Sequence, residues 1–309
     1  MAVMDNSEAS ATVLATKPME LISLDLSSGD HDQNLQELCD QLQLQIGRRI
    51  ASRLRDTNTR KVEVMERELQ IRREQSIAGR FIIIILILVA CYTLALRAIL
   101  ELNDYSWTEV YYSPLIIVAF MFAMVYMMIK STMPLEAFGV TFKNSFAATI
   151  DAIKYSVIFC IILTGLKWLY IAAQSDTATL SVFQTADMFS SYDANGRFDW
   201  TVYILFFVVY TLLCPVQELI GRCGVQAPLF IFLQGSATKR HFLSILVSNL
   251  MYSASHSHLN LSFAVVTFIP GLFWGWLFMK HKSLIGVSIS HAIIGSYALF
   301  ALGLEEFLK

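Results

Sequence analysis

Long apolar stretches recur along the chain from residue 81 onward, separated by short polar segments. A helix needs about 20 mostly apolar residues to cross the hydrocarbon core of a bilayer. By that measure we expect spans at residues 81–101, 112–129, 146–173, 200–216, 242–260, 262–279 and 283–302. The pattern predicts an all-α, polytopic helical membrane protein with about 7–8 transmembrane helices.

The first eighty residues follow a different pattern. Residues 1–30 are rich in Ser, Thr, Asp and Ala and have no long apolar run, so we expect a disordered tail. Residues 31–80 carry apolar side chains at spacings of three and four, which predicts a cytoplasmic amphipathic helical region with a short break at 56–59. This region would either fold back on the membrane domain or form a homo-oligomer through residues 31–78.

Composition supports the membrane class. With 55% hydrophobic residues and a mean hydropathy of +0.54, the chain cannot hide its apolar side chains as a soluble globule would. The basic residues are not gathered into a patch with interleaved aromatic residues, so nucleic-acid binding is not expected. The five cysteines form no Cys-x-x-Cys pair, and we interpret them as small core residues.

The basic residues predict the orientation in the membrane, because cytoplasmic loops carry an excess of Lys and Arg. Several arginines, including Arg73 and Arg80, precede the first span, whereas the charged residues of the loop after it are all acidic. We therefore expect an integral, multi-pass membrane protein with a cytoplasmic N-terminus. Residues 81–111 would comprise the first transmembrane helix and an external loop, and residues 303–309 a C-terminal tail.

One apolar segment, residues 217–234, does not fit as a separate crossing. Such a crossing would place Lys239 and Arg240 on the outer side, against the charge pattern of the other loops. We expect this segment to continue the 200–216 helix, with a kink near Pro215 and a looser stretch at Gly221 and Gly224.

Ionisable side chains recur within this apolar half, where a charge is costly unless it is paired or functional. Glu218 and Arg222 are four residues apart, so a helix would place them on one face as an ion pair. Tyr252 and His256 would lie one turn apart on another helix, and His291 falls near the middle of the last span. For each group the structural alternative is a tethering ion pair or a satisfied buried histidine.

Taken in order, these segments resemble the CPBP family, which includes type II CAAX prenyl proteases and bacteriocin self-immunity proteins. That family carries a Glu-Glu-x-x-x-Arg helix, then a Phe-x-x-x-His helix, then a His-x-x-x-Asn/Asp helix. The matching residues here are Gln217, Glu218, Arg222, Tyr252, His256, His291 and Gly295. The resemblance implies a CPBP-like membrane domain over residues 112–302 and leaves residues 1–80 outside it.

Two positions depart from the family pattern. The glutamate that activates the hydrolytic water in the family is Gln217 here, and an amide cannot take that proton. The family's Asn, which helps to stabilise the developing oxyanion, corresponds to Gly295, which has no side chain. Losing a general base lowers a rate by about 10²- to 10⁴-fold, so the resemblance alone does not establish catalysis.

Two functions therefore remain open. One is an intramembrane endopeptidase that cleaves a membrane-associated peptide or protein. The other is a non-catalytic family member that serves as a membrane scaffold, a regulator or an immunity-type protein. The candidate catalytic residues are Glu218, His256, His291, Arg222 and Gln217.

The same side chains allow two further interpretations. Glu218, His256 and His291 would be acceptable zinc ligands, so a divalent metal is a candidate cofactor that the sequence does not require. A proton-coupled transporter is a minor alternative. At about 1.5 Å per residue, Glu218 would lie near the cytoplasmic edge and His256 deeper than His291, so a shared site requires tilted or offset helices.

Overall fold

The structure, a computed structural model, describes residues 33–102, 108–173, 181–184, 198–257 and 261–304. These residues form helices and contain no strand, which confirms the all-α class. The chain divides into two units, residues 1–67 and 68–309, and each is described by itself. The predicted tail at 1–30 and most of the tail at 303–309 lie outside the described residues.

Helix α2 (Gln33–Leu102) supplies the described part of the first unit and continues into the second. It has no break at 56–59, so that prediction is wrong. Residues 56–59 include neither Gly nor Pro, the residues that most disfavour a helix. The Thr59 hydroxyl donates to the Arg55 carbonyl at 3.0 Å, so this polar side chain is compatible with a helix. Leu44, Leu54 and Met65 are exposed in the first unit, and their pairing with a second copy stays a prediction.

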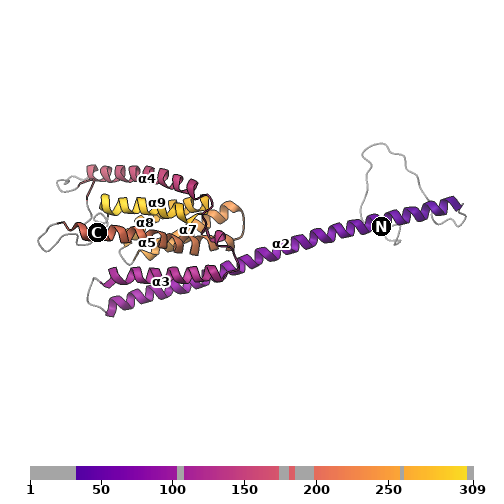
Figure 1. The fold of residues 1–309 in the computed structure, drawn as a ribbon, viewed down its shortest axis with the longest axis horizontal. Helices are drawn as coiled ribbons and strands as arrows, with labels where there is room; N and C mark the ends of the chain where they lie inside the picture. Colours follow the sequence, from indigo (N-terminus) through magenta and orange to yellow (C-terminus); the bar gives the residue numbers. More distant parts are fainter. Residues whose placement is uncertain (1–32, 103–107, 174–180, 185–197, 258–260, 305–309) are drawn as a thin grey trace. The chain divides into compact units, whose positions relative to one another are not determined.

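The second unit is a helical bundle. Most of its long helices lie side by side (Figure 1). In addition to the end of α2, these are α3 (Thr108–Lys130), α4 (Ser145–Ala173), α5 (Trp200–Glu218), α7 (Ala237–Ser255), α8 (Leu261–His281) and α9 (Leu284–Ser296). The shorter elements are η1 (Leu135–Phe138), η2 (Leu219–Gln226), α6 (Ala227–Phe232) and η3 (Tyr297–Ala301).

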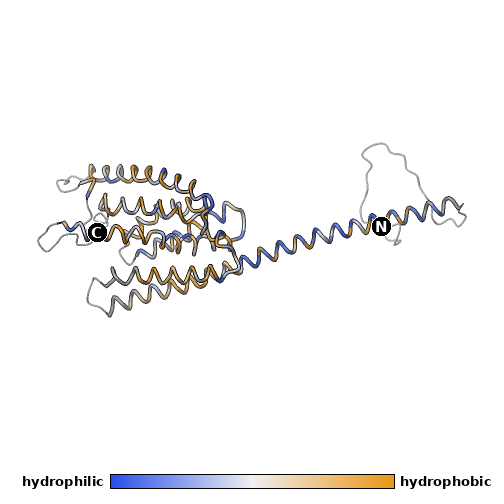
Figure 2. The backbone as a smooth tube through the Cα atoms, viewed as in Figure 1, coloured by the Kyte–Doolittle hydropathy of each residue, from blue (hydrophilic) through white to orange (hydrophobic). Residues whose placement is uncertain are grey.

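Five helical segments of the described chain are long and apolar enough to cross a membrane, namely Asp40–Tyr92, Ser145–Ala173, Trp200–Phe232, Leu261–His281 and Leu284–Ala301. A shorter apolar helix covers Leu115–Lys130. Figure 2 shows that the apolar residues concentrate in the bundle, whereas the first part of α2 is largely polar. The protein is thus a polytopic helical membrane protein, and the total of 7–8 crossings stays a prediction.

The segment predicted as a span at 242–260 is instead α7, which begins at Ala237 and ends at Ser255. It ends early because a polar run follows Ser253 and because the His256 side chain hydrogen-bonds to the Tyr252 carbonyl near the helix C-terminus, at 2.8 Å.

The helix that follows residue 200 is continuous through residue 232, as the charge pattern predicts. It begins at Trp200 because the Asp199 carboxylate accepts hydrogen bonds from the backbone N–H groups of Thr201 at 2.9 Å and Val202 at 3.3 Å. After Glu218 the backbone changes to the π-helix η2, within which both predicted loosening glycines lie. Such π-helical turns inside a longer helix often occur at functional sites.

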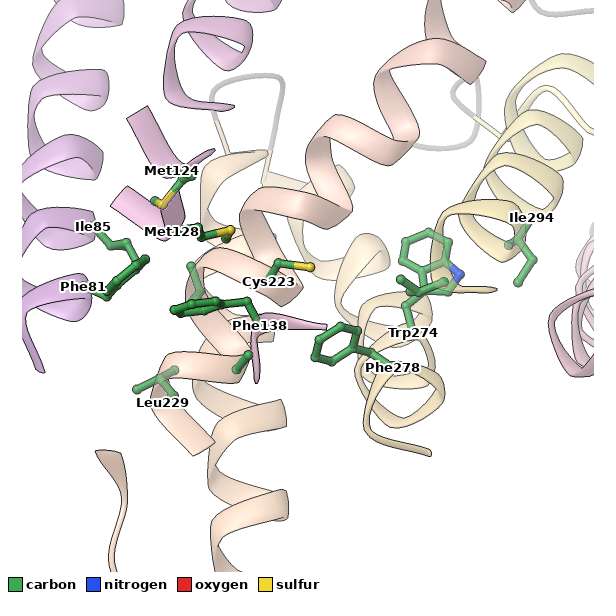
Figure 3. Close-up of a cluster of buried hydrophobic side chains, with 13 residues drawn as sticks. Phe81, Ile85, Met124, Met128, Phe138, Cys223, Leu229, Trp274, Phe278 and Ile294 are labelled. Atoms are coloured by element: carbon green, nitrogen blue, oxygen red, sulfur yellow. The ribbon is translucent and has the colours of Figure 1, made fainter. Parts of the chain in front are cut away.

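A hydrophobic core joins α2 to the rest of the bundle (Figure 3). The rings of Phe81 in α2 and Phe138 in η1 pack with centroids 5.0 Å apart. Met124 of α3 and Cys223 of η2 are also buried in this cluster. Cys214 and Cys223 are buried free thiols, in agreement with their interpretation as core residues, whereas Cys91 is exposed, so for Cys91 that interpretation is wrong. The core holds α2 and α3 beside the helix that carries the first motif.

Candidate functional site

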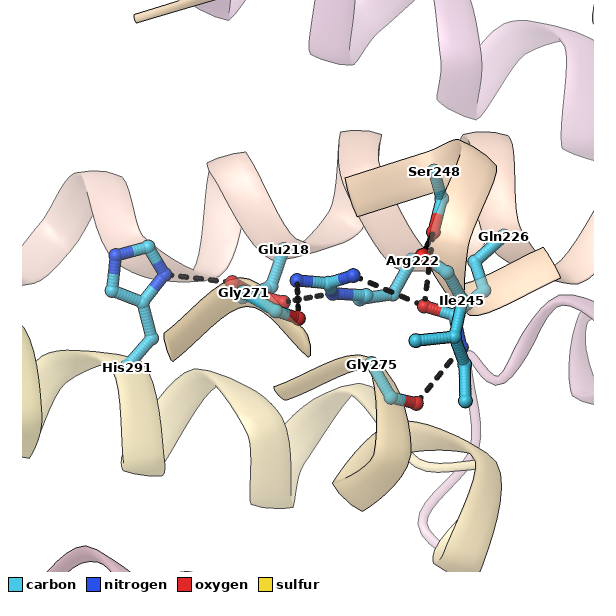
Figure 4. Close-up of polar contacts among 8 residues, drawn as sticks. All are labelled: Glu218, Arg222, Gln226, Ile245, Ser248, Gly271, Gly275 and His291. Carbon is cyan, nitrogen blue, oxygen red and sulfur yellow. Dashed lines mark hydrogen bonds and ion pairs between the residues drawn. The ribbon is translucent and has the colours of Figure 1, made fainter. Parts of the chain in front are cut away.

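A buried ion-pair network links the first and third motifs (Figure 4). Arg222 Nε donates to Glu218 Oε2 at 2.9 Å, which confirms the ion pair that the four-residue spacing predicts. His291 Nδ1 lies 2.7 Å from the other oxygen, Glu218 Oε1. Glu218 is 1% exposed, Arg222 0% and His291 2%. Both carboxylate oxygens of Glu218 are therefore occupied by protein donors, and no bulk water reaches them.

The contact between Glu218 and His291 corrects the depth estimate made from the sequence. That estimate counted residues from the basic loops and placed Glu218 nearer the cytoplasmic edge than His291. The apolar helix instead continues to Phe232, so Glu218 lies well inside it, at the level of His291.

Arg222 also ties its helix to α8. Its Nη2 donates to the Gly271 carbonyl at 3.0 Å, and its Nη1 donates to Gln226 Oε1 at 3.1 Å. Gln226 Nε2 in turn donates to the Gly275 carbonyl at 2.8 Å (Figure 4). A Cβ at Gly275 would lie only 2.9 Å from the Ile245 side chain, so a glycine is needed for this close approach. The guanidinium is thus a cross-link between helices as well as an ion-pair partner.

Aromatic rings enclose His291. The Trp274 ring stacks on its imidazole with centroids 4.0 Å apart. The rings of Tyr252 and Tyr210 approach it edge-on, each with centroids 6.2 Å away. Tyr252 also lies under the Arg222 guanidinium, whose Cζ is 5.8 Å from the ring centroid. Tyr252 therefore contacts both the ion-pair network and, as described next, the cavity beside it.

A cavity of about 320 Å³ is lined in part by Tyr252. Its polar lining comes from Gln217, Ser248, Tyr252, Ser255 and His256. The remaining lining is apolar except for the Tyr92 hydroxyl, and much of it comes from α2 and α3. Neither Glu218 nor His291 lines the cavity, and no carboxylate does so among the described residues. The position of the family's water-activating glutamate therefore faces the cavity as an amide.

The orientation of His256 follows from its own backbone contact. Its Nδ1 lies 2.8 Å from the Tyr252 carbonyl oxygen, which can only accept, so Nδ1 carries the hydrogen. In the neutral ring Nε2 then has the lone pair. The rings of His256 and Tyr252 pack with centroids 4.6 Å apart, as their spacing of one turn predicts.

The second departure from the family pattern has a structural counterpart. A Cβ placed at Gly295 would overlap the hydroxyl of Tyr210, a residue of α5. The tyrosine hydroxyl therefore occupies the space that an asparagine side chain at position 295 would enter. Tyr210 was not singled out from the sequence, although it is a polar group eight residues, or about two helical turns, before Glu218.

The five predicted site residues thus separate into two adjacent groups. Glu218, Arg222 and His291 form the ion-pair network, whereas Gln217 and His256 line the cavity. Their catalytic roles stay predictions. The zinc expectation is not supported, because no group of three or more His, Cys, Asp or Glu side chains in the described part of the chain could hold a metal ion.

Other members of the network escaped sequence reasoning. Gln226 is fully buried and bonds with Arg222, and its position four residues after Arg222 was the available signal. Ser248 donates to the same Gln226 oxygen at 3.3 Å. Trp274 gave no signal in the sequence, because an apolar residue in a membrane helix carries no mark of what it packs against.

Comparison with known families matches residues 199–297 to the family described as type II CAAX prenyl endopeptidase Rce1-like. The matched segment runs from the start of α5 to the end of α9 and contains all three motifs. Helices α2, α3 and α4 precede the matched segment and are not part of it. The match confirms, over these residues, the resemblance to the CPBP family. No curated protein and no solved structure matches the chain.

Proposed function

We propose that this chain, whose residues 199–297 form an Rce1-like domain, binds a membrane-associated peptide or protein without cleaving it. In this proposal the chain is a non-catalytic family member that acts as a membrane scaffold or regulator. One observation carries the proposal, namely that the charged carboxylate does not line the cavity. Gln217 lines the cavity as a neutral amide, whereas Glu218 is buried with both oxygens engaged.

The geometry around Glu218 argues against its replacing the missing base. A general base must reach the proton that it abstracts, directly or through one water. Glu218 does not line the cavity, and moving it there would break its bonds with Arg222 and His291. Removing one partner of a buried pair is costly, typically about 3–5 kcal/mol. The network therefore serves to hold the helices together.

The Tyr210 hydroxyl supports the same conclusion. It fills the space beside position 295, next to His291, where the family has an oxyanion-stabilising side chain. A tyrosine hydroxyl can itself donate to an oxyanion, but Tyr210 does not line the cavity, so its hydroxyl does not replace the family's side chain there. The departure at Gly295 is thus built into the packing.

The cavity keeps the features of a binding site. Pockets for ligands are mostly apolar, with a few polar groups that set orientation. Here the apolar wall comes from α2 and α3, which lie outside the Rce1-like domain, and the polar groups come from the domain itself. We infer that α2 and α3 select the partner, and that Gln217 and His256 hydrogen-bond its polar end.

A photo-crosslinking amino acid at position 120 in α3 tests the binding function, because Phe120 lines the cavity. The matched control is position 115 on the same helix, because Leu115 is 65% exposed and lies outside the cavity lining. We expect capture of an intact partner at position 120 and not at 115. Fragments that depend on the wild-type chain and vanish with His256→Ala would contradict the proposal.

An intramembrane endopeptidase is the second candidate, and one observation favours it. His256 shares the cavity with Gln217, and an imidazole is a common general base. A water held by the Gln217 amide would then be activated by the imidazole. Gln217→Glu distinguishes the two functions, because it should accelerate a weak protease and should create no cleavage in a non-catalytic protein.

A further inference from the structure

A second cavity, of about 670 Å³, lies at the end of the bundle where the α3–α4 connection, α6 and the α8–α9 connection meet. The backbone N–H of Leu284 donates to the Gly139 carbonyl at 3.0 Å and joins two of these connections. The start of the α2 segment in this unit, including Leu69 and Ile77, forms one wall. This cavity is lined by other residues than the motif cavity, and the proposed function does not use it.

The lining of this cavity is amphipathic. Its apolar surface includes Ile77, Met133, Phe230, Ile231 and Met279. Two cations, Arg73 and Lys282, and one carboxylate, Glu74, also line it. Glu74 accepts a hydrogen bond from Gln70 at 3.2 Å. Within the described chain neither Arg73 nor Lys282 forms an ion pair.

Additional positive charge surrounds Phe230 at the cavity wall. Lys282 Nζ lies 5.2 Å from the centroid of the Phe230 ring, and Arg240 Cζ lies 4.2 Å from it. Arg240 also donates two hydrogen bonds, at 3.0 and 2.8 Å, to the Phe230 carbonyl. Arg240 is thereby fixed in place beside the cavity wall, and among the described residues that line the cavity Arg73 and Lys282 outnumber the single carboxylate, Glu74.

The backbone at Lys282 is unusual. The residue follows the last residue of α8 and has a φ of 46°, in the left-handed region where glycine or asparagine is normally found. A lysine there is a conformational disadvantage, and residues held in such conformations tend to occur at functional sites. The side chain of this strained residue lines the cavity.

From these observations we propose that the cavity binds an anionic phospholipid. The headgroup phosphate lies between Arg73 and Lys282, and the acyl chains lie along the apolar wall. A free phosphate would use only the cations and leave the apolar surface uncovered. The lipid assignment also agrees with the predicted cytoplasmic location of this end, because basic pockets between helices on that side bind anionic headgroups.

The test is lipid binding by the full chain, purified in detergent and titrated with phosphatidylglycerol or phosphatidylcholine, with bound lipid counted by native mass spectrometry. The test variant is Arg73→Gln with Lys282→Asn. Asparagine tolerates the left-handed backbone, so this variant should fold. The control variant is Arg72→Gln with Lys154→Gln, which removes the same charge from exposed residues that lie outside the cavity lining and form no ion pair within the described chain.

We expect the wild type to prefer phosphatidylglycerol, and the test variant to bind it about 30-fold more weakly while its thermal unfolding is unchanged or improved. The control variant should keep wild-type binding. Equal losses in both variants would indicate general charge attraction and overturn the proposal. Displacement of the lipid by millimolar inorganic phosphate would identify a free-anion site instead and would also overturn it.

Discussion

Replacing Arg222 by methionine tests whether the ion-pair network holds the helices together. The substitution keeps much of the side-chain volume but removes the three hydrogen bonds that Arg222 donates to Glu218, Gln226 and the Gly271 carbonyl. It also leaves the Glu218 carboxylate, 1% exposed, without its cationic partner. Loss of one partner from a buried pair costs about 3–5 kcal/mol. For a domain of this size that corresponds to a fall in Tm of about 6–20 °C.

The chain supplies its own reporter for this measurement. Cys214 and Cys223 are free thiols with 0% exposure, and both lie close to the network in the sequence. Once the other cysteines, including the exposed Cys91, are replaced by Ser, a thiol-reactive fluorophore added to the detergent-solubilised protein should label Cys214 and Cys223 only on unfolding. The Tm of wild type, Arg222→Met, Glu218→Gln and the double variant can then be compared.

The comparison is a double-mutant cycle. Because the double variant has no unpaired buried charge, we expect it to be less destabilised than the sum of the two single variants. Arg72→Met, at an exposed arginine, is the control and should shift the free energy of unfolding by less than about 0.5 kcal/mol. A Tm for Arg222→Met within about 2 °C of wild type, or strictly additive effects, would refute the reasoning.

Other consequences follow from individual contacts. Gly295→Ala should destabilise by about 1–3 kcal/mol, because its methyl group would overlap the Tyr210 hydroxyl, and by less in a Tyr210→Phe background; equal losses in the two backgrounds would contradict this packing. Ser156 and Ser290 hydrogen-bond at 2.8 Å between α4 and α9, so either Ser→Ala change should cost about 1 kcal/mol and the double change little more, as thermal unfolding would reveal. Gln217→Glu should yield no new peptide fragments in the membrane fraction, and fragments would restore the protease hypothesis. A chelator should leave Tm unchanged, since the described residues contain no three-ligand metal cluster; a clear fall would show that a metal is bound.

Local pattern was sufficient for several parts of the site. The spacing of Glu218 and Arg222 predicted their ion pair, and the spacing of Tyr252 and His256 predicted that they lie one turn apart, because both depend only on the geometry of one helix. The alternation of basic and acidic loops also predicted that residues 217–234 continue the preceding helix. These inferences needed no knowledge of which helices are neighbours.

Inferences between helices were less successful. The relative depths of Glu218 and His291 were misjudged because a residue count along each span does not show how packed helices are tilted and offset. The break at 56–59 was wrong because polar helical residues were taken as loop formers, although the chain there contains no Gly or Pro. The division of the motif residues between a network and a cavity had no sequence signal.

By itself the sequence determined the all-α membrane class, the three motif segments and the two departures at Gln217 and Gly295, because each depends on residue type and spacing within a single helix. The tertiary structure alone decided that His291 reaches Glu218, that Gln217 faces a cavity without a carboxylate, and that the Tyr210 hydroxyl fills the space beside Gly295. Those relations depend on the rotation and offset of packed helices, which side-chain packing sets and a one-dimensional pattern does not contain.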